Sequence, residues 1–213
     1  MRYHDNETQH NLANNPVTIF MHTDVIAQFD RAMDLYMSAR FGGDNAWRVA
    51  CHRAAKIAGA ALEGILPSVP VKAVLVELVA YMDGGTSFVH IGWRNDPHKI
   101  PGAYPMHWAV QIGDDLYDPC LWQLRNMKTP LRLPATPYFH APDWFARARS
   151  GEATDAEGVT WCIDSGSPGL NVGYLVRDDG LPSGVRAQLM NRDTVRVHAG
   201  QVRAAYASMM VAA

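Results

Sequence analysis

Cysteine is scarce in this sequence, and the spacing of the few residues present excludes two classes of protein. The 213 residues include three cysteines, Cys51, Cys120 and Cys162, and no two of them stand in CxxC spacing. Such an odd and sparse set supports neither a disulfide framework nor a thiolate zinc site. Each cysteine therefore needs its own explanation.

Long apolar runs and an excess of one charge are also missing. No apolar run approaches the roughly 20 residues that a membrane helix needs, and the polar start MRYHDNETQHNLANNP lacks the apolar core of a signal peptide. The 19 basic and 21 acidic residues give a formal charge of -2 without a basic block, which argues against nucleic acid or a membrane as a partner. We therefore expect a cytoplasmic protein, and the sequence leaves its oligomeric state open.

Metal and cofactor motifs are absent as well. The 9 histidines never stand in HxH or HExxH spacing, and neither a GxGxxG loop nor a serine nucleophile elbow occurs. Such spacings bring metal ligands or phosphate-binding backbone together. We therefore expect neither a metal site nor a bound cofactor.

What the chain does have is the composition of a globular domain. It is 48% hydrophobic and 19% charged, and its length is sufficient to bury a core. We expect a single domain over residues 1–213. Residues 1–22 are predicted to be a polar leader, and residues 130–213 a C-terminal elaboration of the same domain.

Two helices are predicted in the N-terminal third. Apolar residues between positions 25 and 37 keep helical spacing, with Thr23 as the expected cap. A second helix, capped by Asp44 or Asn45, carries a stripe of small residues that lets it lie close against a sheet. The stripe consists of Trp47, Ala50, Cys51, Ala54, Ala55, Ala58, Ala61 and Leu62.

Strands are predicted in the remainder of the chain. The segments VKAVLVELVAYM and SFVHIGWR stand at hairpin distance, MHWAVQIGDDLYDP predicts a second hairpin around Gly113-Asp114, and VTWCID and NVGYLVR follow. TVRVH shows strand-like alternation, whereas residues 144–148 and QVRAAYASMMVAA favour helix. We therefore expect an α+β fold, with the N-terminal helices packed on a mainly antiparallel sheet.

The second hairpin brings a histidine and a carboxylate near each other. If Gly113-Asp114 is a two-residue turn, Asp118 is a diagonal neighbour of His107 on the same face, at about 5.5 to 8 Å between Cβ atoms. A three-residue loop would instead put the two side chains on opposite faces. With the shorter turn, the carboxylate can hold the imidazole.

Cys51 is the thiol that best suits a histidine of this kind. It lies early in the second helix, on the face expected to meet the sheet, and thiolates are favoured near a helix N-terminus and beside a protonated imidazole. Cys120 is the rival nucleophile because it shares the face of Asp118, but a strand thiol has no helix dipole. His52 and His90 stay open as alternative bases, and a cysteine on a small-residue stripe can equally belong to the core.

The order of these residues resembles the papain-like and transglutaminase-like cysteine enzyme superfamily. In that group a Cys opens a helix, a His begins a strand and an Asp or Asn lies on the following strand. CHRAAKIAGAAL, HWAVQI and LYDP match these places in order, within residues 45–119. The resemblance implies a papain-like or transglutaminase-like core, with Cys51 as nucleophile, His107 as general base and then acid, and Asp118 as the residue that orients the imidazole.

The same resemblance implies Asn45 as an oxyanion donor, although the Trp that usually follows the Cys is here a His. Trp108 and Trp122 flank the site in sequence and are expected to shape an acyl pocket. The predicted function is hydrolysis of an amide, peptide or isopeptide bond, or acyl transfer to an amine, through an acyl-enzyme on Cys51. The alternative is a catalytically inactive member of the same fold that serves as a binding or interaction protein.

Overall fold

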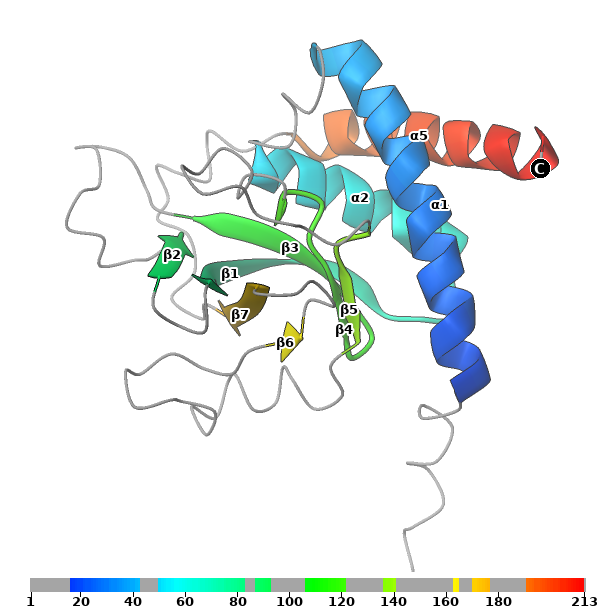
Figure 1. Ribbon diagram of the computed structural model, residues 1–213. Helices are drawn as coiled ribbons and strands as arrows, with labels where there is room; N and C mark the ends of the chain where they lie inside the picture. Colours follow the sequence, from blue (N-terminus) through cyan, green and yellow to red (C-terminus); the bar gives the residue numbers. More distant parts are fainter. Residues whose placement is uncertain are drawn as a thin grey trace, which may run out of the picture.

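The computed structural model describes residues 16–42, 50–82, 87–92, 106–121, 136–140, 163–164, 170–176 and 191–212. Helices α1 (Pro16–Phe41), α2 (Cys51–Ile65) and α5 (Arg192–Ala212) lie on one side of an antiparallel sheet (Figure 1). Helix α2 packs directly on the sheet, and α5 packs against both α2 and α1. The predicted α+β class, with N-terminal helices on a mainly antiparallel sheet, is confirmed.

Strand β1 is the centre of the sheet. The strands are β1 (Val71–Met82), β2 (Ser87–Ile91), β3 (His107–Ile112), β4 (Asp115–Tyr117), β5 (Tyr138–His140), β6 (Ile163–Asp164) and β7 (Leu170–Val176). Their order is β5-β4-β3-β1-β7-β6, and β2 also pairs with β1. Strands β3 and β2 pair in succession along one edge of β1, whereas β7 pairs along the other edge. The start of β3 therefore lies beside the end of β2.

The small residues of α2 let this helix lie close to the sheet, as the stripe predicted. Gly59 is buried against β1, where an added Cβ would lie 3.4 Å from the backbone nitrogen of Ala73. The core joins α2 to one face of the sheet and to α5. It includes Ala54, Ala55, Ala58, Leu75, Val110, Ile112 and Val202.

The start of α1 differs from the prediction. The helix begins at Pro16 rather than after a cap at Thr23, so residues 16–22 belong to a helix and not to a polar leader. Proline is favoured in the first turn of a helix, where its missing N–H has no partner to lose. The apolar residues that follow it then continue the helical pattern.

The start of α2 also differs. Its first residue is Cys51, and Ala50 occupies the N-cap without a side-chain hydrogen bond. Neither Asp44 nor Asn45 is therefore the cap of this helix, and both lie outside the described residues. The difference places Cys51 in the first turn, where the helix dipole acts most strongly.

The segment TVRVH is helical, which corrects the strand-like interpretation. Alternation over so few residues is compatible with either period, and the longer helical pattern prevails. The helix starts at Arg192, where Asn191 Oδ1 accepts a hydrogen bond of 2.7 Å from the backbone nitrogen of Asp193. Its buried residues follow helical spacing and are Val195, His198, Ala199 and Val202. The predicted closing helix is thus confirmed and starts earlier than expected.

Other predicted segments lie partly or wholly outside the described residues. The short helix predicted at 144–148 is outside them, and of VTWCID only the two residues of β6 are described. Within the described part of the chain, no helix combines the length and the apolar character needed to cross a membrane.

Candidate active site

The turn at Gly113-Asp114 has the two-residue form on which the predicted site depends. Ile112 pairs with Asp115 and Val110 pairs with Tyr117. Gly113 has φ 58°, a left-handed conformation that a tight hairpin turn requires and glycine adopts without strain. This register puts residues 107 and 118 on the same face of the hairpin.

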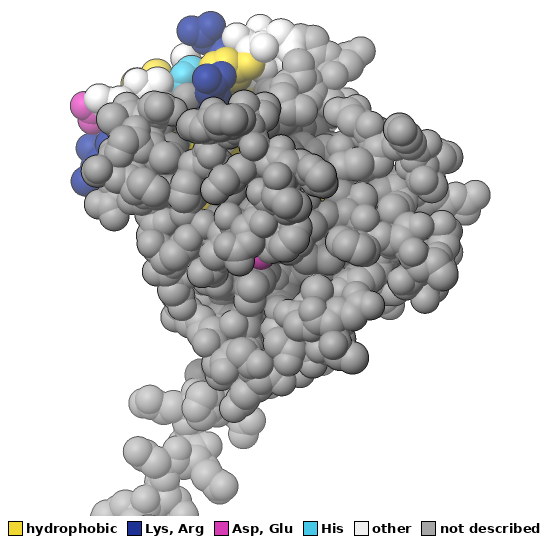
Figure 2. Space-filling model, turned by 90° about the vertical axis from the view of Figure 1, so that its left-hand side faces the viewer, with side chains coloured by type: hydrophobic (Ala, Val, Ile, Leu, Met, Phe, Trp, Pro, Cys, Tyr) yellow, Lys and Arg dark blue, Asp and Glu magenta, His cyan; other side chains and the backbone are white. Residues whose placement is uncertain are grey.

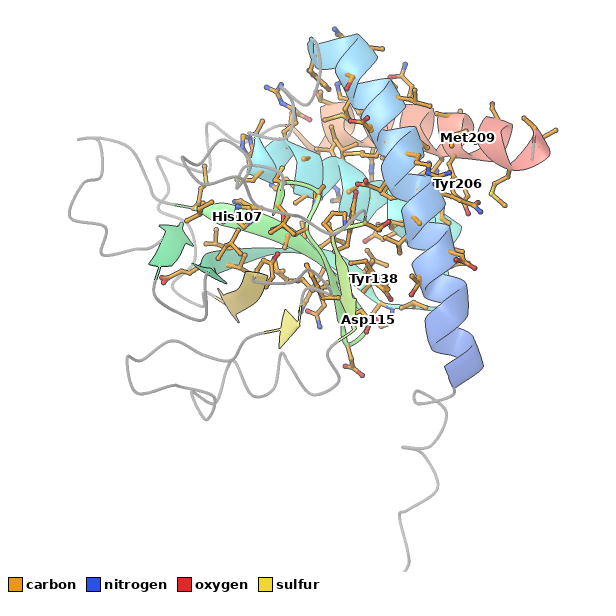
Figure 3. All side chains as sticks on the ribbon, in the orientation of Figure 1. His107, Asp115, Tyr138, Tyr206 and Met209 are labelled. Carbon is orange, nitrogen blue, oxygen red and sulfur yellow. The ribbon has the colours of Figure 1, made fainter. Side chains whose placement is uncertain are left out.

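His107 and Asp118 form a buried hydrogen-bonded pair. The Nε2–H group of His107 donates to Asp118 Oδ2 at 2.8 Å, and both side chains are 0% exposed. Asp118 Oδ1 accepts a second hydrogen bond of 2.9 Å from the backbone nitrogen of Cys120. Figure 3 shows His107 at one end of β3, whereas the hydrogen-bonded Asp115 and Tyr138 lie at the opposite end of the hairpin.

The charges around His107 favour its protonated form. Burial lowers the pKa of His107, but the Asp118 carboxylate, with smaller contributions from Cys51, raises it to about 10, well above the usual 6.5. Nε2 is occupied by Asp118. Nδ1 is buried and has no hydrogen-bond partner among the described residues. An imidazole held in this way has only Nδ1 to offer to a thiol.

Cys51 lies where α2 and β3 both begin. It is a free thiol, 8% exposed, and its Sγ lies 3.8 Å from the carbonyl oxygen of Met106, the residue before His107. The first residues of a helix carry N–H groups without intrahelical acceptors, and the dipole there favours negative charge. Figure 2 views the side of the molecule where α2 begins, and the described side chains seen along its upper and left edges include basic, acidic and hydrophobic groups. The site thus combines a thiol, a helix N-terminus and an imidazole whose surroundings favour its protonated form.

The other predicted residues are placed less directly. Strand alternation puts Trp108 on the face opposite to His107, where it joins the core and Lys56 Nζ lies 5.5 Å from its ring centre. Its role in an acyl pocket therefore stays a prediction. Asn45 and Trp122 lie outside the described residues.

The rival residues can also be located in part. Cys120 is fully buried and forms no disulfide, and its backbone nitrogen donates a hydrogen bond to Asp118. His52 is half-buried on α2, and burial together with Arg53 and Lys56 lowers its pKa. Cys162 and the side chain of His90 are not among the described groups, so their parts in the site stay as predicted.

Sequence reasoning missed two residues that contact this pair. Tyr174 on β7 donates its hydroxyl to Asp118 Oδ2 at 2.9 Å and is fully buried. Gly92, which follows β2, has φ 78°, and an added Cβ would lie 2.7 Å from the backbone nitrogen of His107. No local pattern indicates either contact, because each depends on how separate strands pair with β1. A glycine inside the predicted strand segment SFVHIGWR is the one signal that the sequence offered.

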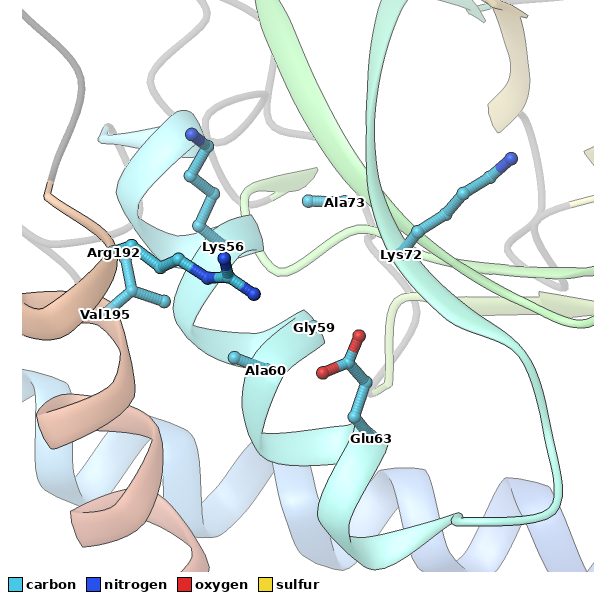
Figure 4. A pocket seen from close by; sticks show the side chains of 8 residues that line it. All are labelled: Lys56, Gly59, Ala60, Glu63, Lys72, Ala73, Arg192 and Val195. Carbon is cyan, nitrogen blue, oxygen red and sulfur yellow. The ribbon is translucent and has the colours of Figure 1, made fainter.

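A separate hollow of about 390 Å³ lies between α2, β1 and α5. Figure 4 shows Arg192 and Glu63 directed toward its centre, with Lys56 and Lys72 extending away from it. Its described lining contains no cysteine or histidine, so it does not share the chemistry of the His107 site. Among the described residues, no group of three His, Cys, Asp or Glu side chains is arranged to hold a metal ion.

The chain was compared with known families, proteins and structures. No protein-family model, curated protein or solved structure matches this chain. The functional argument therefore depends on the geometry of the site and on the order of its residues in the sequence.

Proposed function

We propose that this protein is a thiol-dependent acyl hydrolase or acyl transferase, with a papain-like or transglutaminase-like core, that acts on an amide, peptide or isopeptide bond. The observation that carries the proposal is the meeting of three elements: Cys51 opens α2, His107 opens β3, and Asp118 directly follows β4. The elements are distant in sequence, yet the His107–Asp118 bond is 2.8 Å and Cys51 Sγ lies 3.8 Å from the carbonyl oxygen of Met106, the residue before His107.

A purely structural role explains this arrangement less well. Removing two charged groups from water is costly, and an apolar pair of similar size often stabilises a fold at least as well. Strongly shifted pKa values are concentrated at functional sites, because catalytic groups need pKa values suited to their task. The buried charge of the His107–Asp118 pair beside a helix-terminal thiol therefore favours chemistry over packing.

The proposed reaction has two steps. The Cys51 sulfur attacks the substrate carbonyl carbon, and His107 transfers the thiol proton to the leaving nitrogen as the C–S bond forms and the C–N bond breaks. Water or an acceptor amine then attacks the acyl carbon, and His107 takes a proton from this nucleophile and transfers it to sulfur as the C–S bond breaks. The Asp118 carboxylate orients His107 and stabilises the imidazolium in both steps.

The developing oxyanion needs a hydrogen-bond donor. The N–H groups of Cys51 and His52 open α2 ahead of Arg53, whose N–H donates to the Ala50 carbonyl, so these first two N–H groups suit this role. Asn45 is proposed as the second donor, through its side-chain amide. Trp108 and Trp122 are proposed to shape the acyl pocket.

Selective alkylation of the native protein tests the proposal. Iodoacetamide at pH 6 should label Cys51 at least about ten times faster than Cys120, because thiolates form at this pH only beside a cation or a helix N-terminus. Peptide mass mapping gives the two rates in the same sample. Equal, slow labelling of both thiols in the folded protein would instead favour an inactive member of the fold that serves as a binding protein.

A further inference from the structure

We propose that Tyr174 is a positioning residue of this site. Its hydroxyl fixes the orientation of the Asp118 carboxylate, and the carboxylate in turn fixes the imidazole of His107. The inference rests on the proposed function, because it extends the same thiol chemistry to a fourth side chain. Tyr174 lies on β7, which pairs with the edge of β1 opposite to β3. It therefore approaches Asp118 from a part of the sheet that carries none of the other proposed residues.

The strand registers explain how Tyr174 reaches the pair. Tyr174 pairs with Leu78 of β1, and His107 pairs with Val76 of β1. Residues 76 and 78 point to the same face of a strand, since side chains alternate with a period of two. Tyr174 and His107 thus lie on one face of the sheet, on either side of β1.

The hydrogen bonds of Asp118 show what Tyr174 contributes. Oδ1 is fixed locally by the backbone nitrogen of Cys120 at 2.9 Å. Oδ2 accepts from His107 Nε2 at 2.8 Å and from the Tyr174 hydroxyl at 2.9 Å. Among the described residues, Tyr174 is the group that fixes Oδ2 independently of His107. Its hydroxyl therefore defines where the imidazole is held.

The surroundings of Tyr174 keep its hydroxyl protonated, so that it donates to Asp118. Its side chain is fully buried, and its ring centre lies 6.0 Å from that of Phe139. Burial, followed by the charges of Asp118 and Cys120, raises the pKa of Tyr174 well above its usual value. Among the residues that the structure describes, the titratable groups that face this hydroxyl are Asp118 and Cys120, and His107 and then Cys51 lie beyond the carboxylate. The tyrosine proton thus stays in place while the imidazole titrates.

A matched pair of variants tests the proposal in the full-length protein. Tyr174→Phe removes the hydroxyl on Asp118, and Tyr117→Phe removes another fully buried tyrosine hydroxyl, which donates to Asp30 Oδ1 at 2.6 Å. Tyr174→Phe should lower the pKa of His107, read from its carbon-bound ring protons by NMR. It should also slow alkylation of Cys51 at pH 6 roughly ten- to a hundred-fold, as small misplacements of catalytic groups do. Tyr117→Phe should change neither quantity, even if both variants melt at a lower temperature.

An unchanged His107 titration and an unchanged Cys51 alkylation profile in Tyr174→Phe would overturn the positioning role. If Tyr174→Phe does not fold, 3-fluorotyrosine in place of Tyr174 decides, because its fluorine resonance should shift with the midpoint of the His107 titration. A fluorine chemical shift that does not change at the midpoint of the His107 titration would also overturn the proposal. If wild-type Cys51 is unreactive while Tyr174→Phe still lowers the pKa of His107, the proposed function fails and the coupling of Tyr174 to His107 stands.

Discussion

The two ring nitrogens of His107 lie in different surroundings, and this difference defines what the residue can do. Nε2 is bonded to Asp118, whereas Nδ1 is buried without a hydrogen-bond partner among the described residues. A ring that is fixed at one nitrogen is oriented, and the other nitrogen is available for proton transfer. In the proposed reaction, proton exchange with Cys51 therefore uses Nδ1.

The raised pKa of His107 makes the stability of the fold depend on pH. Because the folded value of about 10 exceeds the ordinary 6.5, the stabilisation is fully present below pH 6.5 and is lost as the pH rises through 10. The free energy of unfolding of the wild type, relative to that of His107→Gln, should fall over this window by on the order of a few kcal/mol. Urea denaturation of both proteins near pH 6.5 and near pH 10 measures this change in the free energy of unfolding. A difference between the two proteins that stays constant with pH would contradict the raised pKa.

Gly92 offers a second test at the residue scale. An alanine there would suffer from the left-handed backbone and from contact with the backbone nitrogen of His107. Gly92→Ala should therefore cost more than the roughly 1–2 kcal/mol of a left-handed alanine and should also slow Cys51 alkylation. Gly42→Ala is the matched control, because Gly42 has φ 90° but nothing within 4 Å of its added Cβ. Gly42→Ala should lower the free energy of unfolding in urea denaturation without slowing Cys51 alkylation. Equal effects of the two variants on alkylation would refute a specific role of Gly92 beside His107.

At the scale of elements, local patterns predicted the strands better than the helix starts. The β3–β4 hairpin was predictable because the turn residues and the two-residue period lie within one short segment. The start of α2 was not, because Ala50 at its N-cap carries no capping side chain and the polar residues before it were favoured instead. The start of α5 was missed because a short alternating segment was interpreted apart from the longer helical pattern.

The cap of α5 tests the corrected assignment of this segment. Asn191 Oδ1 accepts the hydrogen bond from the nitrogen of Asp193, so Asn191→Ala should lower the free energy of unfolding by about 1 kcal/mol. Asn191→Asp should retain most of the stability, since aspartate caps a helix as well as asparagine does. Urea denaturation of the three proteins gives the comparison. Equal losses for the two substitutions would show that the helix does not start at this residue.

At the scale of the whole molecule, the site is assembled from segments that are far apart in sequence. The sequence predicted Cys51, His107 and Asp118 because the hairpin turn puts His107 and Asp118 on one face, Cys51 lies early in a helix expected to meet the sheet, and their order resembles a known superfamily. Tyr174 and Gly92 could not be predicted in the same way. Their contacts depend on which strands pair with the two edges of β1, and non-local pairing leaves no periodic signal in the chain.

The central claim is that Cys51 forms an acyl-enzyme with the help of His107. The most direct measurement is the reaction with p-nitrophenyl acetate at neutral pH, followed by nitrophenolate release and by peptide mass spectrometry. The wild type should give a burst of one equivalent and an acetyl group on Cys51, whereas Cys51→Ala and His107→Ala should give neither. Thermal melts should confirm that the variants are folded, since removing one sulfur costs about 1 kcal/mol or less. A burst that persists in folded Cys51→Ala would contradict the account.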